Sequence, residues 1–335
     1  MLKFIGKRLL QGIFVIVGLS MLIFIISRLV PGDPARLALG PRASQEAVDL
    51  LRQELYLDEP LPKQYVLWLR DVFQGDLGDS LVTKRPVAMD VAQFLPATLE
   101  LALFSALIMV VFSLLFGLFS AKYKNKAPDT VIRIFAYIGV AVPSFVMAVL
   151  LLLLFGYVWK VIPVIGRLST GVAAPATITG FYTIDSLLTG NFRTAWDAML
   201  HLLLPALALA IGPLFQEARI LRSSLVDNMS KEHISVSTGY GLPGGLLMRK
   251  YLFKSSFGPV INVMGLDFAS MIGNAFLVET IFNWPGLSRY GINAMLYKDL
   301  NAISAVIIII GLVFLVVNLI VDILSAYVDP RIHLG

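Results

Sequence analysis

The sequence contains no cysteine and little charge, since Asp, Glu, Lys and Arg make up 15% of its 335 residues. A soluble protein carries about a quarter charged residues, so a soluble domain is a poor fit to this composition. The absence of cysteine excludes disulfide bonds, a thiolate zinc site and a cysteine nucleophile. The chain also lacks a G-x-x-x-x-G-K-[ST] phosphate loop, an H-E-x-x-H zinc motif and a G-x-S-x-G nucleophile elbow.

Long hydrophobic runs are what the sequence has in abundance. It is 57% hydrophobic, with a mean hydropathy of +0.80, and five uncharged runs extend over 19 residues or more. These runs are 9–27, 101–121, 134–159, 198–216 and 300–321. A sixth apolar segment, 258–282, is interrupted only by Asp267 and Glu279. A helix rises about 1.5 Å per residue, so about 20 residues cross a hydrocarbon core of about 30 Å. The sequence therefore predicts an all-α integral membrane protein with six transmembrane helices.

The charges around these runs predict the topology. Lys3, Lys7 and Arg8 precede a first run that is too long for a signal peptide and is followed by no Ala-x-Ala site, so we expect a retained span that begins inside. With alternating sides, the inner segments hold 14 Lys and Arg and the two short outer loops hold five, which agrees with the positive-inside rule. The inner segments are 1–8, 122–133, 217–257 and 328–335, and the outer loops are 160–197 and 283–299. Both termini are expected in the cytoplasm, and the dispersed bases predict no nucleic-acid binding.

The long outer segment 31–95 has helical periodicity. Val48, Leu51 and Leu55 repeat at helical spacing, and a second amphipathic pattern covers 65–73 and ends at Gly75. These helices either cap the transmembrane bundle or take part in receiving substrate. We divide the chain into residues 1–95, the first span with this loop, and residues 96–335, a five-helix core with its inner loop.

The inner loop 217–257 has a helix, a break and a second amphipathic piece. The first helix is expected around 230–238, the break spans 241–245 and the second piece covers 246–253. This order suits docking into a groove on another protein. We expect its exposed anchors to be Leu242, Leu246, Leu247 and Tyr251. An interfacial connector parallel to the membrane remains the alternative.

This inner helix, which ends in Gly241-Leu242 between the fourth and fifth spans, resembles the coupling loop of ATP-binding-cassette importer permeases. More narrowly, the chain resembles the first permease subunit of dipeptide, oligopeptide and nickel importers. Further motifs match that family in order along the whole chain: Pro31-Gly32-Asp33-Pro34, Gly75-Asp76-Leu77-Gly78, residues 94–101, Leu204-Pro205-Ala206, residues 279–287, residues 318–322 and Asp329-Pro330-Arg331.

The resemblance implies a type I importer permease fold in the bacterial cytoplasmic membrane. It implies four kinds of partner: a second permease subunit, two cytoplasmic ATPase subunits, an external solute-binding protein and membrane lipid. ATP and Mg would be bound by the ATPases, and this chain would hold no cofactor or metal and catalyse no reaction itself. The residues that would couple it to the ATPases are Ser237, Gly239, Gly241, Leu242, Pro243 and Leu246. Related loops have an alanine-rich basic run here, and Gly239 should weaken this helix by about 1 kcal/mol relative to Ala.

Polar residues inside the predicted spans are candidates for lining a substrate path. A charge near the bilayer centre costs about 2.5–3.5 kcal/mol on insertion scales unless it faces a cavity or a partner. Asp267 lies in the middle of the fifth span near Asn274, and Glu100 and Glu279 lie near the outer ends of the second and fifth spans. A hydrogen bond between helices is the alternative for each of them.

The sequence leaves the substrate open. The same machinery could import peptides, nickel or a metal chelate. A channel independent of ATPases, or a membrane enzyme that uses Asp267, Glu279 and Glu100, is a competing class. Nothing in the sequence places a nucleophile or a metal beside those carboxylates.

Overall fold

The computed structural model describes residues 2–29, 33–40 and 42–328. Pro31 and Gly32 of the first motif and the final Asp329-Pro330-Arg331 lie outside the described residues. Within these ranges the regular secondary structure is all helical, and the one β-type pairing is an isolated bridge between Asp79 and Pro86. The predicted all-α class is confirmed.

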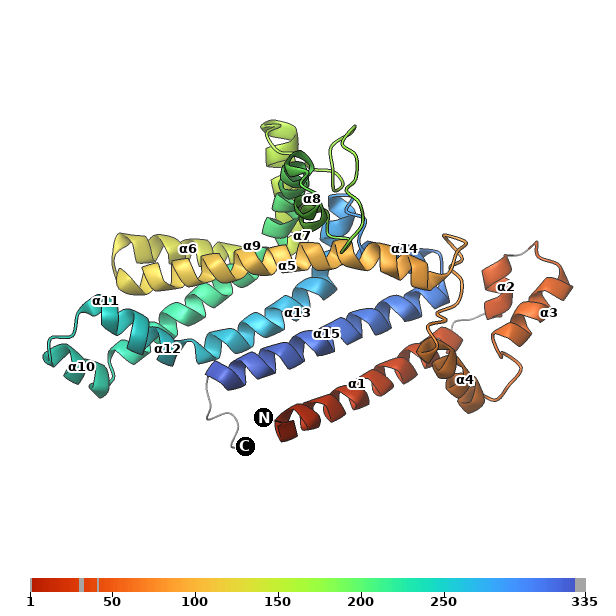
Figure 1. The fold of residues 1–335 in the computed structure, drawn as a ribbon, viewed down its shortest axis with the longest axis horizontal. Helices are drawn as coiled ribbons and strands as arrows, with labels where there is room; N and C mark the ends of the chain where they lie inside the picture. Colours follow the sequence, from red (N-terminus) through yellow and green to blue (C-terminus); the bar gives the residue numbers. More distant parts are fainter. Residues whose placement is uncertain (1, 30–32, 41, 329–335) are drawn as a thin grey trace.

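Five long helices form the body of the molecule, and each is long and apolar enough to cross a membrane. They are α1 (Leu2–Leu29), α5 (Val87–Lys122), α9 (Phe192–Met229), α13 (Gly258–Ile281) and α15 (Leu300–Val328). α1 packs against α15, α15 against α13, and α9 against both α13 and α5 (Figure 1). Five of the six predicted spans therefore exist as continuous helices.

The third predicted span, 134–159, is not one continuous helix. α6 (Ala127–Ala141) and α7 (Ser144–Leu151) meet at an angle of 106°, and α7 continues into a π-helical segment, η1 (Leu152–Val158). The bend lies at Val142, whose backbone is extended, and Pro143 follows it. Proline disfavours the helical conformation of the preceding residue and has no N–H to continue the ladder. In Figure 1, α7 leaves the row of long helices, whereas α6 lies along it.

The outer segment folds as a helical cap. It contains α2 (Pro34–Leu39), α3 (Gln45–Glu54) and α4 (Leu61–Phe73), so both predicted amphipathic helices are confirmed. Tyr65 and Trp68 of α4 pack against Phe24 of α1, with ring centroids 5.3 and 5.7 Å away. Between α4 and α5, Asp299 at the start of α15 accepts hydrogen bonds from Ser80 Oγ and the Leu81 N–H, both 2.7 Å long. The cap is therefore fixed to the first and last long helices.

The opposite end of the bundle gathers the segments predicted to face the cytoplasm. Figure 1 shows the start of α1, the α5–α6 turn, the helices after α9 and the end of α15 at one end, with α2 to α4 at the other. Buried Asp129 of α6 accepts two 2.7 Å hydrogen bonds from the guanidinium of Arg222 on α9. It also accepts from Ser120 Oγ on α5, at 2.5 Å. α9 runs to Met229, so the inner connection begins later than the predicted residue 217.

Candidate substrate path and coupling loop

The inner connection has the predicted order of helix, break and helix. α10 (Glu232–Gly239) is followed by a turn, then by α11 (Gly244–Leu246), π-helical η2 (Leu247–Leu252) and α12 (Phe253–Ser256). Gly241 has φ +76°, a region that favours glycine. The N–H of Gly241 donates to the Thr238 carbonyl at 2.9 Å, and the N–H of Leu242 donates to the Ser237 carbonyl at 3.3 Å. These two bonds form a Schellman motif, which explains a Gly-Leu pair at the end of this helix.

The predicted exposure of the docking anchors is wrong for Leu247 and only partly met by Leu242. Leu247 is 5% exposed and belongs to the apolar core, and Leu242 is half-buried against that core. Leu246 and Tyr251 are exposed, as predicted. The remaining large exposed apolar side chains of α10 and its turn are Val236 and Tyr240, the latter 85% exposed. Of the other predicted coupling residues, Gly239 and Pro243 are exposed and Ser237 is half-buried.

The coupling loop, residues 230–257, is attached firmly to the helices on either side of it. The side-chain amide of Asn228, at the end of α9, donates to Ser256 Oγ of α12 at 2.8 Å. Ile234, Leu247 and Leu252 are buried in the same apolar core as α9 and α13. Displacement of the loop would therefore displace both long helices.

Glu279 lies at the outer end of α13 and is fully buried. Its carboxylate accepts from Thr98 Oγ1 of α5 at 2.5 Å and from the N–H of Arg289 at 2.8 Å. Thr98 Oγ1 in turn accepts from the N–H of Leu287, the first residue of α14 (Leu287–Leu296). Side chains of two other helices thus satisfy N–H groups that the first turn of α14 would leave unpaired. A Cβ at Gly286 would overlap the Glu279 carboxylate.

Glu100, near the outer end of α5, is also buried and paired. It accepts from Arg167 Nη2 at 2.5 Å and from the N–H and Oγ1 of Thr183 at 2.8 and 2.6 Å. The Arg167 guanidinium lies over the Tyr182 ring, 3.5 Å from its centroid, and also donates to the Gly180 carbonyl. Sequence reasoning missed Arg167, because a single arginine in a polar loop carries no signal of its partner 67 residues away.

Asp185 organises the same outer loop from α8 (Tyr182–Leu188). Its buried carboxylate accepts four hydrogen bonds of 2.6–3.1 Å, from the N–H groups of Ile178, Thr179 and Gly180 and from Thr179 Oγ1. Burial acts to raise the pKa of the Asp185 carboxyl, but these hydrogen bonds outweigh it and lower the pKa below its ordinary value of 3.8. The loop is therefore built on an ionised side chain.

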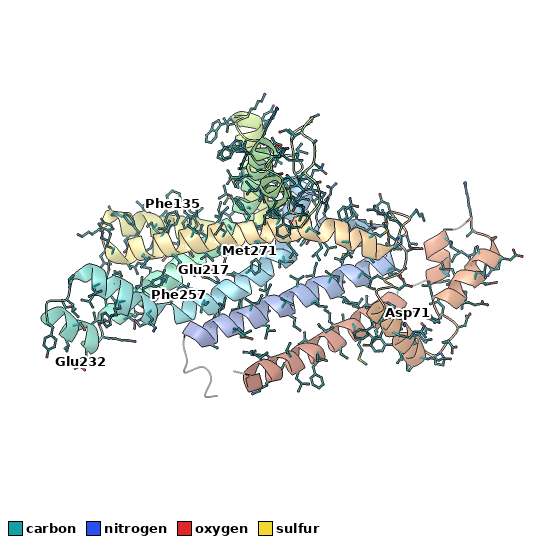
Figure 2. All side chains as sticks on the ribbon, viewed as in Figure 1. Asp71, Phe135, Glu217, Glu232, Phe257 and Met271 are labelled. Carbon is teal, nitrogen blue, oxygen red and sulfur yellow. The ribbon has the colours of Figure 1, made fainter. Side chains whose placement is uncertain are left out.

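Asp267 and Glu217 are carboxyl groups on the long helices with buried oxygens that accept no hydrogen bond of ordinary geometry from the described residues. One oxygen of half-buried Asp267 on α13 is buried and accepts no hydrogen bond. Glu217 on α9 is fully buried and accepts no hydrogen bond of ordinary geometry, although the Ser113 hydroxyl of α5 lies close enough to interact with it. Figure 2 labels Glu217 among the long helices. Sequence reasoning missed Glu217 because the uncharged run ends just before it. The buried residues of α9 that share its face would have identified it: Leu214, Ala218, Leu221 and Leu225.

Asn274 lies on an exposed, partly polar face of α13. Asn262, Ser270 and Gly273 share this face and are also exposed, with Leu266 and Leu277 among them. Helical spacing places these residues on one stripe along the helix. The other long helices expose mainly apolar side chains, as at Phe14 and Leu103. The exposed stripe of α13 therefore mixes polar and apolar side chains within a helix long and apolar enough to span a membrane.

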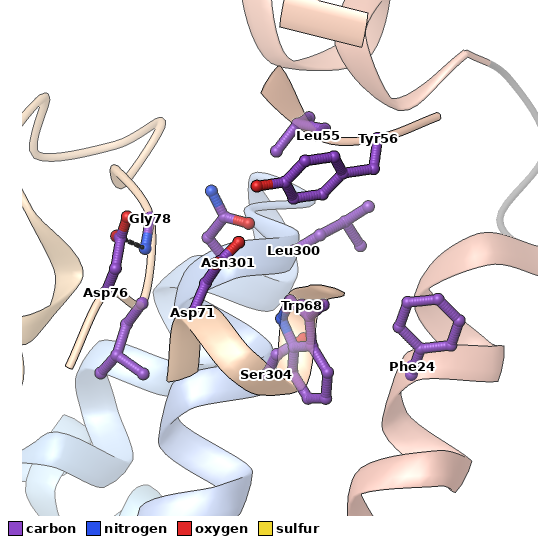
Figure 3. Close-up of a pocket in the computed structure, with 11 residues that line it drawn as sticks. Phe24, Leu55, Tyr56, Trp68, Asp71, Asp76, Gly78, Leu300, Asn301 and Ser304 are labelled. Carbon is purple, nitrogen blue, oxygen red and sulfur yellow. Dashed lines mark hydrogen bonds between the residues drawn. The ribbon is translucent and has the colours of Figure 1, made fainter. Parts of the chain in front are cut away.

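A small cavity of about 100 Å³ lies at the outer end of the molecule, between α1, α4 and α15 (Figure 3). Tyr56 and Trp68 contribute aromatic walls, and Asp71, Asp76 and Asn301 contribute polar groups. The Asp76 carboxylate accepts from the N–H of Gly78 at 2.9 Å. Here and elsewhere in the described part of the chain, no three His, Asp or Glu side chains are grouped to hold a metal ion.

Comparison with known proteins identifies relatives along the whole chain. Residues 113–334 match the family described as "Binding-protein-dependent transport system inner membrane component", and residues 1–102 match its N-terminal part. The probable D,D-dipeptide transport system permease protein DdpB of Escherichia coli K12 is 38% identical over 323 residues, which are 96% of this chain and 95% of that protein. The dipeptide transport system permease protein DppB of Alkalihalophilus pseudofirmus OF4 is 35% identical over 99% of both chains. The glutathione transport system permease protein GsiC of Pectobacterium atrosepticum is 33% identical over 99% of both.

The replacement Asp185→Asn should loosen the outer loop at neutral pH. An amide accepts through one oxygen only, and bonds to a charged group contribute about 1.5–3 kcal/mol, so the opening equilibrium of 178–190 should rise about ten-fold or more. Hydrogen–deuterium exchange of this segment in the purified protein measures the effect. Since the folded pKa is lowered, the contribution of Asp185 is present above about pH 4 and is lost as the pH falls through the folded pKa. Asp76→Asn, in the other outer loop, is the control. Unchanged exchange in Asp185→Asn would contradict the assigned role.

Proposed function

The chain belongs to the family of binding-protein-dependent transport system inner membrane components, and from that premise we propose that it is a permease subunit that imports di- and oligopeptides. The observation that carries the proposal is its full-length similarity to permeases named for dipeptide transport. The relatives named for glutathione transport support the same substrate class, because glutathione is a small peptide. The chain is a multi-pass protein of the cytoplasmic membrane.

The proposal requires partners that supply energy and substrate. We expect a second permease subunit, two cytoplasmic ATPase subunits that bind ATP and Mg, and an external binding protein. The family description supports the last of these directly. The absence of a phosphate loop from the sequence supports a division of labour in which this chain hydrolyses no ATP itself.

The geometry of the coupling loop suits the transmission of movement. Exposed Val236, Tyr240 and Leu246 form the surface that we expect to dock into an ATPase groove. The Asn228–Ser256 hydrogen bond and the buried Leu247 join this surface to α9 and α13. Closure of the ATPases would then move α13. ATP binding and the opening of the substrate path to one side of the membrane would thus be linked by a coupling free energy.

We assign the path to the exposed stripe of α13, with Asn274 and Asp267 as its polar contacts. A stripe of amide and hydroxyl groups at membrane depth is stable where it faces water or a polar cargo. Glu100 and Glu279 have partners within the chain, and their contribution to the path is to position the outer loops at its mouth.

The proposed function is tested with the assembled complex in proteoliposomes. Addition of binding protein, ATP and a radiolabelled dipeptide should give uptake that stops when ATP is omitted. Excess unlabelled oligopeptide should compete with the label, and nickel should not. Flux without ATP would instead identify a channel, and uptake of nickel with no uptake of any peptide would replace the substrate class.

The replacement Gly241→Ala should uncouple ATP hydrolysis from uptake. A left-handed backbone costs a residue with a Cβ about 1–2 kcal/mol, so the turn after α10 should shift and misplace the docking surface. Gly239→Ala is the matched control. Gly239 lies within α10, and a Cβ there would have no atom within 4 Å, so Ala should stabilise α10 by about 1 kcal/mol. Gly239→Ala should therefore preserve uptake and should not lower the ratio of peptide imported to ATP hydrolysed. The measurement is the ratio of peptide imported to ATP hydrolysed. An unchanged ratio in Gly241→Ala would remove this turn from the mechanism.

The replacement Asn274→Leu should reduce dipeptide uptake several-fold without changing assembly of the complex, because it removes a polar contact from the stripe. Asn318→Leu makes the same chemical change on α15, in the groove against α1, and should leave uptake unchanged. Uptake rates are compared at equal amounts of assembled complex, measured by size-exclusion chromatography. Equal rates for the two variants would exclude Asn274 from the path.

A further inference from the structure

A groove of about 530 Å³ lies at the inner end of the molecule, between α5 and the segment that follows the coupling turn. One wall is a single face of α5, formed by side chains three and four residues apart. The other wall comes from η2 and α12. The lining residues are Leu115, Leu118, Phe119 and Lys122 on α5, and Met248 and Phe253 opposite.

The groove is apolar along its length and basic at its inner end. Leu115 is 55% exposed and Phe119 47% exposed, so a large apolar surface is uncovered. Lys122 is the last residue of α5, is exposed, and forms no ion pair with any described residue. Its ammonium lies 5.4 Å from the centroid of the Tyr123 ring. No acidic side chain lines the groove.

Further lysines are close in sequence to the residues that line the groove. Lys124 and Lys126 follow Lys122 in the turn to α6, and Lys250 and Lys254 stand next to the residues of the opposite wall. All four are exposed. Asp129, the acidic residue nearest to this turn in the sequence, is buried and engaged by Arg222. Basic pockets between transmembrane helices on the cytoplasmic side suit anionic lipid headgroups.

We propose that this groove binds one anionic phospholipid of the cytoplasmic leaflet. Its phosphate contacts Lys122, and an acyl chain lies along Leu118 and Leu115 toward the bilayer centre. The order of side chains, apolar toward the membrane interior and basic at the cytoplasmic end, matches the order of groups along such a lipid. The lipid then joins α5 to the chain that leaves the coupling turn at Pro243. This binding does not depend on what the protein transports.

The test uses lipid-dependent quenching at the groove. Because the chain contains no cysteine, Leu115→Cys introduces a single labelling site for a fluorophore in this subunit. The assembled complex, with reactive cysteines removed from its other subunits, is placed in zwitterionic nanodiscs. Bromine-labelled phosphatidylglycerol or phosphatidylcholine is then titrated. Phosphatidylglycerol should quench at the lower mole fraction. A label at Phe14→Cys, exposed on α1, should be quenched equally by both lipids.

The role of the lysine is tested in the same assay. Lys122→Gln should raise the mole fraction of phosphatidylglycerol needed for half-quenching about five-fold, and Lys122→Arg should preserve binding. Lys7→Gln, an exposed lysine at the inner end of α1, is the control and should change nothing. Equal quenching by the two lipids, or no shift in Lys122→Gln, would overturn the proposal. Absence of quenching by either lipid would also overturn it, because another protein chain would then cover the groove.

Discussion

Carboxyl side chains buried where helices end make the hydrogen bonds on which this structure depends. The ends of helices leave backbone N–H groups unpaired, and loops between spans have few apolar contacts of their own. Asp129 at the inner end accepts hydrogen bonds from a segment distant in the sequence, as do Glu100, Glu279 and Asp299 at the outer end. Each of these carboxyl groups therefore joins its own helix to another part of the chain. Asp129 and Glu100 accept from the guanidinium groups of arginine residues, and such charge-assisted bonds are roughly twice as strong as neutral ones. The long helices provide the apolar body, and these carboxylates fix how it is joined at both ends.

Acidic residues in this apolar sequence fall into two structural groups. Glu100 and Glu279 are buried with several donors, which is the pattern of a structural joint. Asp267 and Glu217 lie within the bundle with oxygens that accept no bond from the described residues. Buried polar groups are normally satisfied, so these two are the side chains for which the isolated chain gives the least structural explanation. The sequence alone does not separate the two groups, because both occur as single acids beside long apolar runs.

Much of the fold followed from hydrophobicity and charge, because a spanning helix needs only length and apolarity. Five spans and the two predicted outer helices were found in this way. The bend at Pro143 was missed because an uncharged run of 26 residues satisfies the length criterion whether or not it is straight. The burial of Glu217 was missed because the boundary of the run was taken from charge instead of from helical periodicity. In the coupling loop, the helix end at Gly241 and Leu242 followed from the sequence, but periodicity could not say that Leu247 faces the core. The pairing of Glu100 with Arg167 depends on the tertiary fold and has no local signature.

The exposed glycine at position 239 has a consequence for the energetics of transport. It lies in the last turn of α10 with no neighbour around it, so it lowers the helical stability of the docking element without any gain in packing. If that turn frays for part of each cycle, some nucleotide is consumed while the permease stays still. The number of ATP molecules hydrolysed per peptide imported then depends on a single short helix of the membrane subunit. Because cooling favours the helix, it should lower that number.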